Sequence, residues 1–356
     1  MRKMMLVSAL ALACLIPGLA RSVTPEEQVV WDQANDWYSQ GYALDAEGVA
    51  ALEKRIATDP DNEASRFKAL TYYVAHYYDK GGKERCSPRI QAHYLWLSAN
   101  RPAKPYFVYW AQLADTSLGP LYQALAQGWQ ASARQNSGNA AVLGNAAIFL
   151  AAEKPAWAEW YYLRAQKLEP QKPQWRSQLG DLLMSGAPVS RSMAAKALAQ
   201  YDAAYALQQG TQERYEMQLG MGNAAWQAGQ MARARAAAQA LLNVTRYASP
   251  VPRDQMSYYE HEAKHLLGLV AYQEGRRPEA VSYLLQAGRA EPGSLLKSKG
   301  PDFMLAKLLL AAGEKGAVLQ FLGYCEKFWD NDKLHAWEKL VEAGGSPTFD
   351  KKAALK

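Results

Sequence analysis

Small residues, large apolar residues and helix breakers recur in residues 261–294 at a spacing that suits two antiparallel helices. The positions are Leu267, Gly268, Gly275, Ala280, Leu284, Ala287 and Pro292. A small residue where two helices cross lets their backbones approach, and large apolar residues one turn away fill the groove beside it. Glycine tolerates a positive φ and proline does not continue a helix, so Gly275 and Pro292 mark helix ends. The segment is therefore expected to form a helical hairpin.

The hairpin pattern recurs along much of the chain, and repeats of this length predict a stack of hairpins. The further copies cover residues 139–172, 175–204, a stretch with Leu219 and Gly229, and a last stretch beginning near Lys299. The unit at 261–294 resembles a tetratricopeptide (TPR) repeat, with the family's leucine-glycine, alanine and proline positions at matching offsets. Residues 29–135 match the pattern only in part.

The TPR resemblance implies an all-α fold, a right-handed superhelical solenoid of antiparallel helix pairs. We expect an export signal at residues 1–20, a degenerate helical region at 21–135, TPR-like repeats with C-terminal capping helices at 136–343, and a polar tail at 344–356. TPR motifs specify a fold and leave the chemistry open.

The family's clamp for a peptide carboxylate uses Lys and Asn on first helices. That activity is not expected here, because His265 stands at one of the matching positions.

The composition is that of an ordinary globular protein, with 49% hydrophobic and 21% charged residues. These values exclude wholesale disorder, a collagen-like chain and a polytopic membrane protein. Abundant alanine and scarce isoleucine favour helices over sheets. The formal charge is +6, and the basic residues are spread singly along the predicted helices. Nucleic acid is therefore not an expected partner, because no basic cluster is present to neutralise phosphates.

The first twenty residues have the organisation of an export signal. A basic start at residues 1–3 precedes an apolar run from Met4 to Ile16, and small residues stand at Gly18 and Ala20. The run of about 13 residues is shorter than the roughly 18 to 20 that span a bilayer. The mature protein is therefore expected to be periplasmic or secreted. A lipoprotein anchored at Cys14 is disfavoured, because the residues that follow are apolar.

Cys86 and Cys325 would be the two cysteines of the mature chain. They are far apart in sequence, and in an elongated solenoid such residues are rarely neighbours. Neither belongs to a Cys-x-x-Cys or Cys/His pattern with metal or redox spacing. Both are expected to be buried or idle thiols.

Residues 261–265 read His-Glu-Ala-Lys-His, which matches the H-E-x-x-H motif of zinc metallopeptidases. On a helix, His261 and His265 fall one turn apart and could chelate zinc, while Glu262 could activate a metal-bound water. Lys264 places a positive charge beside His265, where it would repel a zinc ion. No recognisable motif supplies a third zinc ligand. The motif also coincides with the first positions of the best repeat. A polar helix face is therefore the preferred interpretation.

Aromatic residues are abundant, with 11 Trp and 21 Tyr. Most are expected to pack between helices. The adjacent pairs Tyr72-Tyr73 and Tyr161-Tyr162 cannot both point inward from one helix face, so some members are expected to be exposed and to offer a binding surface. His76 and His93 have no acidic or cysteine neighbour at ligand spacing and are expected to be structural.

These observations favour a non-enzymatic protein interaction scaffold of the cell envelope, with a protein or peptide partner and no cofactor. The concave groove of the solenoid would capture an extended peptide or a helix. Tyr258, Tyr259, Glu262 and His265 are the candidate groove residues. The alternatives are a zinc-dependent metallopeptidase that uses His261 and His265 as ligands with Glu262 as the base, and a glycan-binding envelope module that uses exposed aromatic residues.

Overall fold

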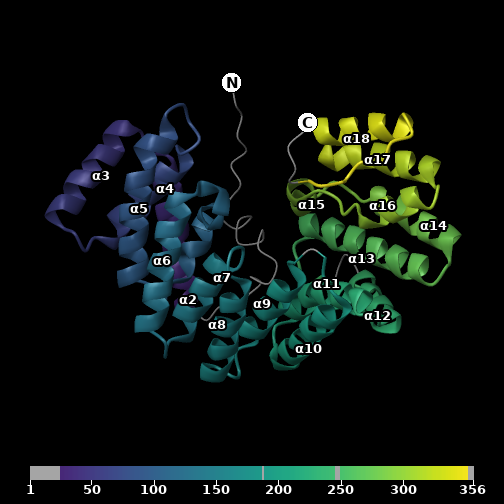
Figure 1. Cartoon of the computed structure of the whole chain (residues 1–356), viewed down its shortest axis with the longest axis horizontal. Coiled ribbons are helices and arrows are strands. Elements are labelled where there is room, and N and C mark those ends of the chain that lie inside the picture. The colour runs from purple at the N-terminus through teal and green to yellow at the C-terminus, as the bar shows by residue number, and fades with distance from the viewer. Residues whose placement is uncertain (1–24, 187, 245–248, 352–356) are drawn as a thin grey trace. The chain divides into compact units, whose positions relative to one another are not determined.

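The fold is entirely helical in the part of the chain that can be described, residues 25–186, 188–244 and 249–351 of a computed structural model. The helices follow one another along the chain with short connections (Figure 1). None of them is both long and apolar enough to cross a bilayer within these ranges. The predicted export signal, residues 1–20, lies outside them.

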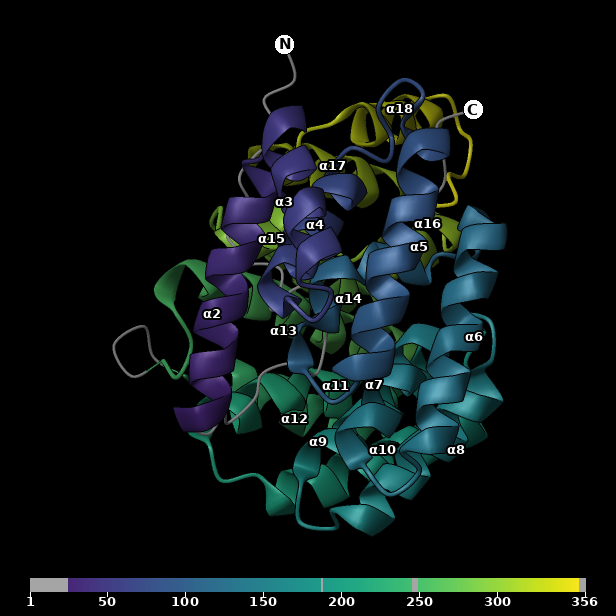
Figure 2. The ribbon, with the colours of Figure 1, turned by 90° about the vertical axis from the view of Figure 1, so that its left-hand side faces the viewer.

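The chain divides into two compact units, residues 1–182 and 183–356, and the division falls in the last turn of α9. The first unit contains α2 (Pro25–Tyr42), α3 (Ala46–Thr58), α4 (Glu63–Ala75), α5 (Gly82–Asn100), the 3-10 segments η1 (Pro105–Ala114) and η2 (Thr116–Leu118), α6 (Pro120–Gln135), α7 (Ala140–Leu150), α8 (Pro155–Leu168) and most of α9 (Pro173–Met184). Consecutive helices contact each other from α3 to α8, and Figure 2 shows α4, α5 and α6 in order.

The core of the first unit is rich in aromatic rings. Phe67 of α4 contacts Tyr106, Tyr109 and Trp110 of η1, and all four side chains are buried. The indole of Trp129 donates a hydrogen bond to the Tyr94 hydroxyl at 3.0 Å. This aromatic 3-10 segment inserts between helices where a repeat would place a plain turn. It interrupts the succession of helix pairs within residues 29–135, which match the repeat pattern only in part.

Asn145 on α7 stands where the repeat pattern expects leucine. Its amide donates to the backbone carbonyls of Pro102 and Lys104 at 2.8 and 2.9 Å, in the segment that leads into η1. The asparagine thus ties the segment before η1 to α7.

The second unit contains α10 (Arg191–Leu207), α11 (Thr211–Gln227), α12 (Met231–Leu242), α13 (Arg253–Gln273), α14 (Arg277–Gly288), α15 (Ser294–Lys299), α16 (Met304–Ala311), α17 (Lys315–Trp329) and α18 (Asp332–Glu342). Each helix from α10 to α14 contacts the next, and α11 also contacts α13. Contacts between neighbours and next neighbours are typical of stacked hairpins.

Glycines allow the close helix crossings expected from the sequence. A Cβ on Gly268 would lie 2.2 Å from Cδ2 of Leu305, and a Cβ on Gly222 would lie 2.5 Å from Cδ2 of Leu266. At the turn, Gly275 has a φ of 78°, in the left-handed region that favours glycine. The predicted roles of Gly268 and Gly275 are confirmed.

The segment after α18 packs against other parts of the second unit over residues 346–351. The Phe349 ring is buried and stacks on Phe303, with centroids 5.4 Å apart. The Lys351 ammonium donates to the carbonyls of Lys299 and Pro301 at 2.9 and 3.0 Å. Part of the predicted polar tail is therefore fixed to the helices.

Cys86 and Cys325 are both buried and free, as expected. Burial raises the pKa of both thiols. They are therefore protonated and unreactive at neutral pH.

Candidate functional site

The two histidines of the HEAKH motif lie on α13 with their rings parallel and 6.4 Å apart. Both side chains are buried. Nδ1 of His261 is 2.9 Å from the Ala287 carbonyl, to which it donates, and its Nε2 accepts the backbone N–H of Asp302 at 3.1 Å. Nε2 of His265 accepts the backbone N–H of Leu305 at 3.0 Å.

These hydrogen bonds give both imidazoles a structural role. The first N–H groups of a helix have no partner within the helix, and here the two side chains satisfy N–H groups at the start of α16. Burial lowers the pKa of His261 to about 4 and also lowers the pKa of His265, so both rings are neutral at pH 7. A zinc ion would need the same Nε2 lone pairs that now accept backbone N–H groups.

The structure places Glu262, His265 and Asp302 together, with one ligand atom from each within 4.8 Å of the others. Nε2 of His265 is 3.4 Å from Oδ1 of Asp302. His261, the other predicted ligand, does not join this group and is held by Ala287 and Asp302 as described. A second such group in the described part of the chain, Glu326, His335 and Glu338, is more exposed.

The two carboxyl groups of this cluster differ in charge. Burial and the nearby Asp302 raise the pKa of Glu262 to about 8, although Lys351 and Lys299 act in the opposite direction. Burial also acts to raise the pKa of Asp302, but His265, the Met304 N–H and Lys351 together lower it. Glu262 is therefore largely protonated at neutral pH, and Asp302 is ionised.

Tyr258 and Tyr259, the other predicted groove residues, contact neighbouring helices. Tyr259 is buried against the Tyr215 ring of α11, with centroids 5.2 Å apart. Tyr258 is half-buried, and the Lys299 ammonium lies 5.3 Å from its ring centroid. With Glu262 and His265 also buried, the four residues pack against this chain and do not form an exposed groove.

A pocket of about 420 Å³ in the second unit was missed by sequence reasoning. Three methionines contribute to its wall: Met184 at the end of α9, Met231 at the start of α12 and Met304 at the start of α16. Trp226, Gln227 and Gln273, at the ends of α11 and α13, also line it. These residues lie at helix ends that only the folded chain brings together, and no spacing in the sequence identifies them.

Two donors near this pocket have no acceptor in the described part of the chain. The indole N–H of Trp226 is enclosed by the protein and is therefore not open to the pocket. Arg191, the first residue of α10, is exposed and forms no ion pair there. A Cβ on Gly229 would lie 3.3 Å from the Arg191 guanidinium, so this turn glycine leaves room for the side chain.

The expectation that adjacent tyrosine pairs expose a member is wrong. Tyr72 and Tyr73 are both 8% exposed, and Tyr161 and Tyr162 are both 4% exposed. Helix α4 is covered on several sides because α2, α3 and α5 all contact it. A helix surrounded in this way buries residues on more than one face.

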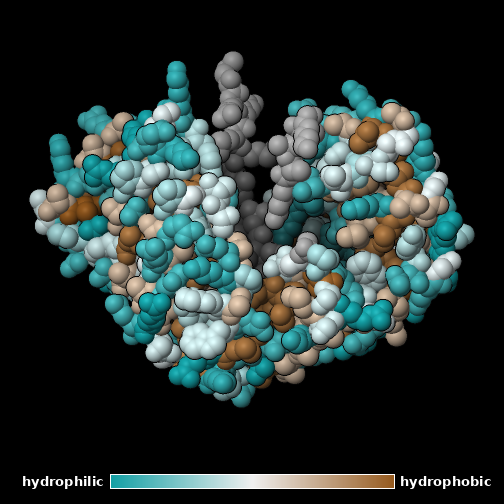
Figure 3. All heavy atoms as spheres, in the orientation of Figure 1, coloured by the Kyte–Doolittle hydropathy of each residue, from teal (hydrophilic) through white to brown (hydrophobic). Residues whose placement is uncertain are grey.

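Other aromatic side chains are exposed. They are Tyr42, Tyr78, Trp157 and Trp160. Tyr78 borders a smaller pocket of about 260 Å³ with Tyr77, Asp79, Lys83 and Ser117. The Tyr77 hydroxyl is buried and has no partner among the described residues. In Figure 3, apolar residues form small patches within a mostly hydrophilic visible face.

The predicted structural histidines also have partners. Nε2 of His93 is 3.0 Å from Oε1 of Glu53, and the Tyr73 hydroxyl donates to the same oxygen at 2.9 Å. Nδ1 of His76 lies 2.9 Å from the Tyr72 carbonyl. The acid that holds His93 is 40 residues away in sequence, which is why local spacing does not reveal it.

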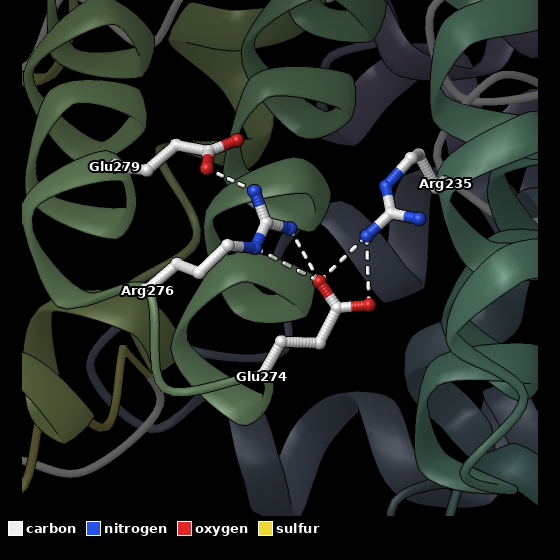
Figure 4. A network of polar contacts seen from close by, with 4 residues as sticks. All are labelled: Arg235, Glu274, Arg276 and Glu279. Atoms are coloured by element: carbon white, nitrogen blue, oxygen red, sulfur yellow. Dashed lines mark hydrogen bonds and ion pairs between the residues drawn. The ribbon is translucent and has the colours of Figure 1, made fainter.

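An exposed polar network joins α12 to the turn between α13 and α14 (Figure 4). Arg235 donates to both carboxylate oxygens of Glu274 at 2.7 and 2.6 Å, and Arg276 bonds both Glu274 and Glu279. Hydrogen bonds from Arg276 and Arg235 lower the pKa of Glu274. The network links consecutive hairpins at the surface, where ion pairs contribute little to stability.

Comparison with known protein families finds no match, and no curated protein is similar in sequence.

Proposed function

We propose that this protein is a non-enzymatic interaction scaffold that binds a peptide segment of a partner protein. The observation that carries the proposal is the methionine-lined pocket, meaning the pocket bordered by Met184, Met231, Met304, Trp226 and Arg191. Apolar walls with a few polar groups are typical of ligand sites. Methionine side chains are flexible and polarisable, and they recur on surfaces that bind varied peptides.

We further propose that the helix pairs form a TPR-like right-handed superhelix and that the chain is exported. The consecutive helix contacts and the turn glycines support the first point, and the signal-like residues 1–20 support the second. A periplasmic or secreted location would present the pocket to envelope proteins. Comparing the mass and location of the mature protein with those of a variant lacking residues 1–20 tests the export.

The scaffold is tested by affinity capture from an extract of the cells that make the protein. Met231→Glu places a charge in the pocket wall at the first position of α12, where a helix tolerates an acid well. Met193→Glu is the matched control, because Met193 lies in the first turn of α10 and does not line the pocket. A partner retained by the wild type and by Met193→Glu but lost by Met231→Glu supports the proposal. Equal capture by all three proteins contradicts it.

A glycan-binding module is the second candidate, favoured by the exposed Tyr78 ring beside the smaller pocket with Lys83 and Ser117. Aromatic faces stack on sugar rings while neighbouring polar groups bond the hydroxyls. Titration with soluble envelope glycan fragments should perturb the NMR signals of the wild type and not those of Tyr78→Ala. Identical responses of the two proteins would exclude this site.

A further inference from the structure

The shape and lining of the methionine-lined pocket limit what it can bind. Its volume of about 420 Å³ lies within the range of about 300 to 1,000 Å³ usual for ligand pockets. The thioether chains of Met184, Met231 and Met304 and the ring of Trp226 supply apolar contacts. A bulky apolar side chain is the natural complement of such a wall.

The polar groups at the pocket favour a ligand that offers both hydrogen-bond donors and acceptors. The Trp226 ring lines the pocket, but its N–H is enclosed by the protein, so a ligand in the pocket would meet the ring and not this donor. Gln227 and Gln273 add amides that can both donate and accept. A peptide backbone can form hydrogen bonds with these amides through its own N–H and C=O groups. The hydrocarbon chain of a fatty acid can form none.

The charge at the pocket favours an anionic group. None of the described residues that line it is acidic, and Arg191 at the rim has no ion pair in the described part of the chain. The closest acid in sequence to the lining residue Gln273 is Glu274, which Arg235 and Arg276 already engage. A ligand carboxylate beside the apolar group would therefore meet an available cation.

We propose that the pocket binds a partner segment in which an acidic side chain adjoins a bulky apolar one, the apolar group lying between the methionines and the carboxylate facing Arg191. This inference rests on the proposed scaffold function and names the chemistry of its partner. The carboxylate is that of a side chain within a segment, so binding does not require a free peptide C-terminus.

The test uses four peptides with acetylated and amidated ends, which differ only in a central Glu-Leu, Gln-Leu, Glu-Ser or Lys-Leu. Binding to the chain from residue 21 onward is followed by NMR of 13C-methyl-labelled methionines, which detects weak binding at individual side chains. The signals of Met184, Met231 and Met304 should shift with the Glu-Leu peptide, while Met193, outside the pocket, serves as the internal control.

The Glu-Leu peptide should bind at least about tenfold more tightly than Glu-Ser, because a buried leucine is lost in the latter. It should bind about threefold more tightly than Gln-Leu at low salt, and this difference should shrink as salt screens the exposed Arg191. Arg191→Gln should abolish the preference for Glu over Gln and keep the preference for Leu over Ser. Arg253→Gln, at an exposed arginine outside the pocket, should change neither.

Equal affinity for Glu-Leu and Gln-Leu at low salt, or shifts that spare the three pocket methionines, would overturn the inference. The outcome is separable from that of the scaffold. If capture of a partner depends on Met231 while the peptides show no preference for acid, the partner chemistry is wrong and the scaffold stands. If capture does not depend on Met231, the scaffold itself is wrong.

Discussion

The imidazoles of His261 and His265 stand one helical turn apart on α13 and together hold the start of α16 by accepting the backbone N–H groups of Asp302 and Leu305. A motif known for binding zinc here serves to join two elements that are about 40 residues apart in sequence. This relationship makes the motif's contribution to stability measurable.

His265→Ala should lower the free energy of unfolding by about 2 to 4 kcal/mol, because it leaves the Leu305 N–H buried without an acceptor and opens a cavity. His335→Ala is the control, at a half-exposed histidine of the same unit whose partners are surface carboxylates, and should change stability by less than about 1 kcal/mol. Urea denaturation followed by circular dichroism measures both. Equal stability of the two variants would show that the hydrogen bond contributes nothing.

Zinc should not bind stoichiometrically to the purified protein. The His265 lone pair accepts Leu305, Glu262 is largely protonated at neutral pH, and Lys351 lowers the affinity of the cluster for cations. Metal analysis after dialysis against zinc measures the ratio. About one zinc per chain that disappears in His265→Ala would revive the metallopeptidase alternative.

Stability should decrease as pH rises from about 6.5 to 8. Because the pKa of Glu262 is raised to about 8 in the folded state, from about 4.3 when unfolded, the folded state holds a proton that the unfolded state has lost. This contribution is complete below about pH 4.3 and is lost as pH rises through the folded pKa. Burial lowers the pKa of His261 to about 4, so this residue makes stability rise with pH. That rise is complete near pH 6.5, the pKa of an unfolded histidine, and does not affect the range above it.

Glu262→Gln isolates this effect, because it keeps the shape and removes the titration. Between about pH 6.5 and 8 the wild type should lose about 1 to 2 kcal/mol of unfolding free energy relative to the variant. Urea denaturation at a series of pH values measures the difference. Parallel pH profiles of the two proteins would mean that Glu262 is ionised throughout.

Gly268→Ala should destabilise the second unit by about 1 to 3 kcal/mol, because the added methyl group would overlap Leu305. Gly323→Ala on α17 is the matched control. Its Cβ would lie 3.6 Å from the Glu338 carboxylate, and loss of a helical glycine there should stabilise by about 0.5 to 1 kcal/mol. Thermal unfolding measures both. Effects of the same sign in both variants would contradict the close crossing at Gly268.

The helix pairs and their turns could be predicted because they depend on local chemistry. Gly275 needs a positive φ wherever a hairpin turns tightly, and Gly268 needs space wherever two helices cross closely. Burial was harder to predict. The exposure expected for Tyr72 or Tyr73 fails because helices on several sides cover α4, and one helix's sequence does not report its neighbours.

The candidate site could likewise be predicted only where it depends on local sequence. The HEAKH motif is visible in the sequence, but its role depends on Asp302 and Leu305, which only the folded chain brings to the imidazoles. The pocket could not be predicted at all, since Met184 and Met304 come from helix ends far apart in sequence. A single methionine in a sequence does not indicate that its side chain will line a pocket.

The three pocket methionines also give the protein a sensitivity to oxidants. Hydrogen peroxide converts accessible thioethers to sulfoxides, which are polar and which methionine sulfoxide reductases can reverse. Met304 is 43% exposed, so it is accessible to such oxidants. Oxidation would turn an apolar wall into a polar one, and the pocket's affinity for apolar groups would then depend on the redox conditions around the protein.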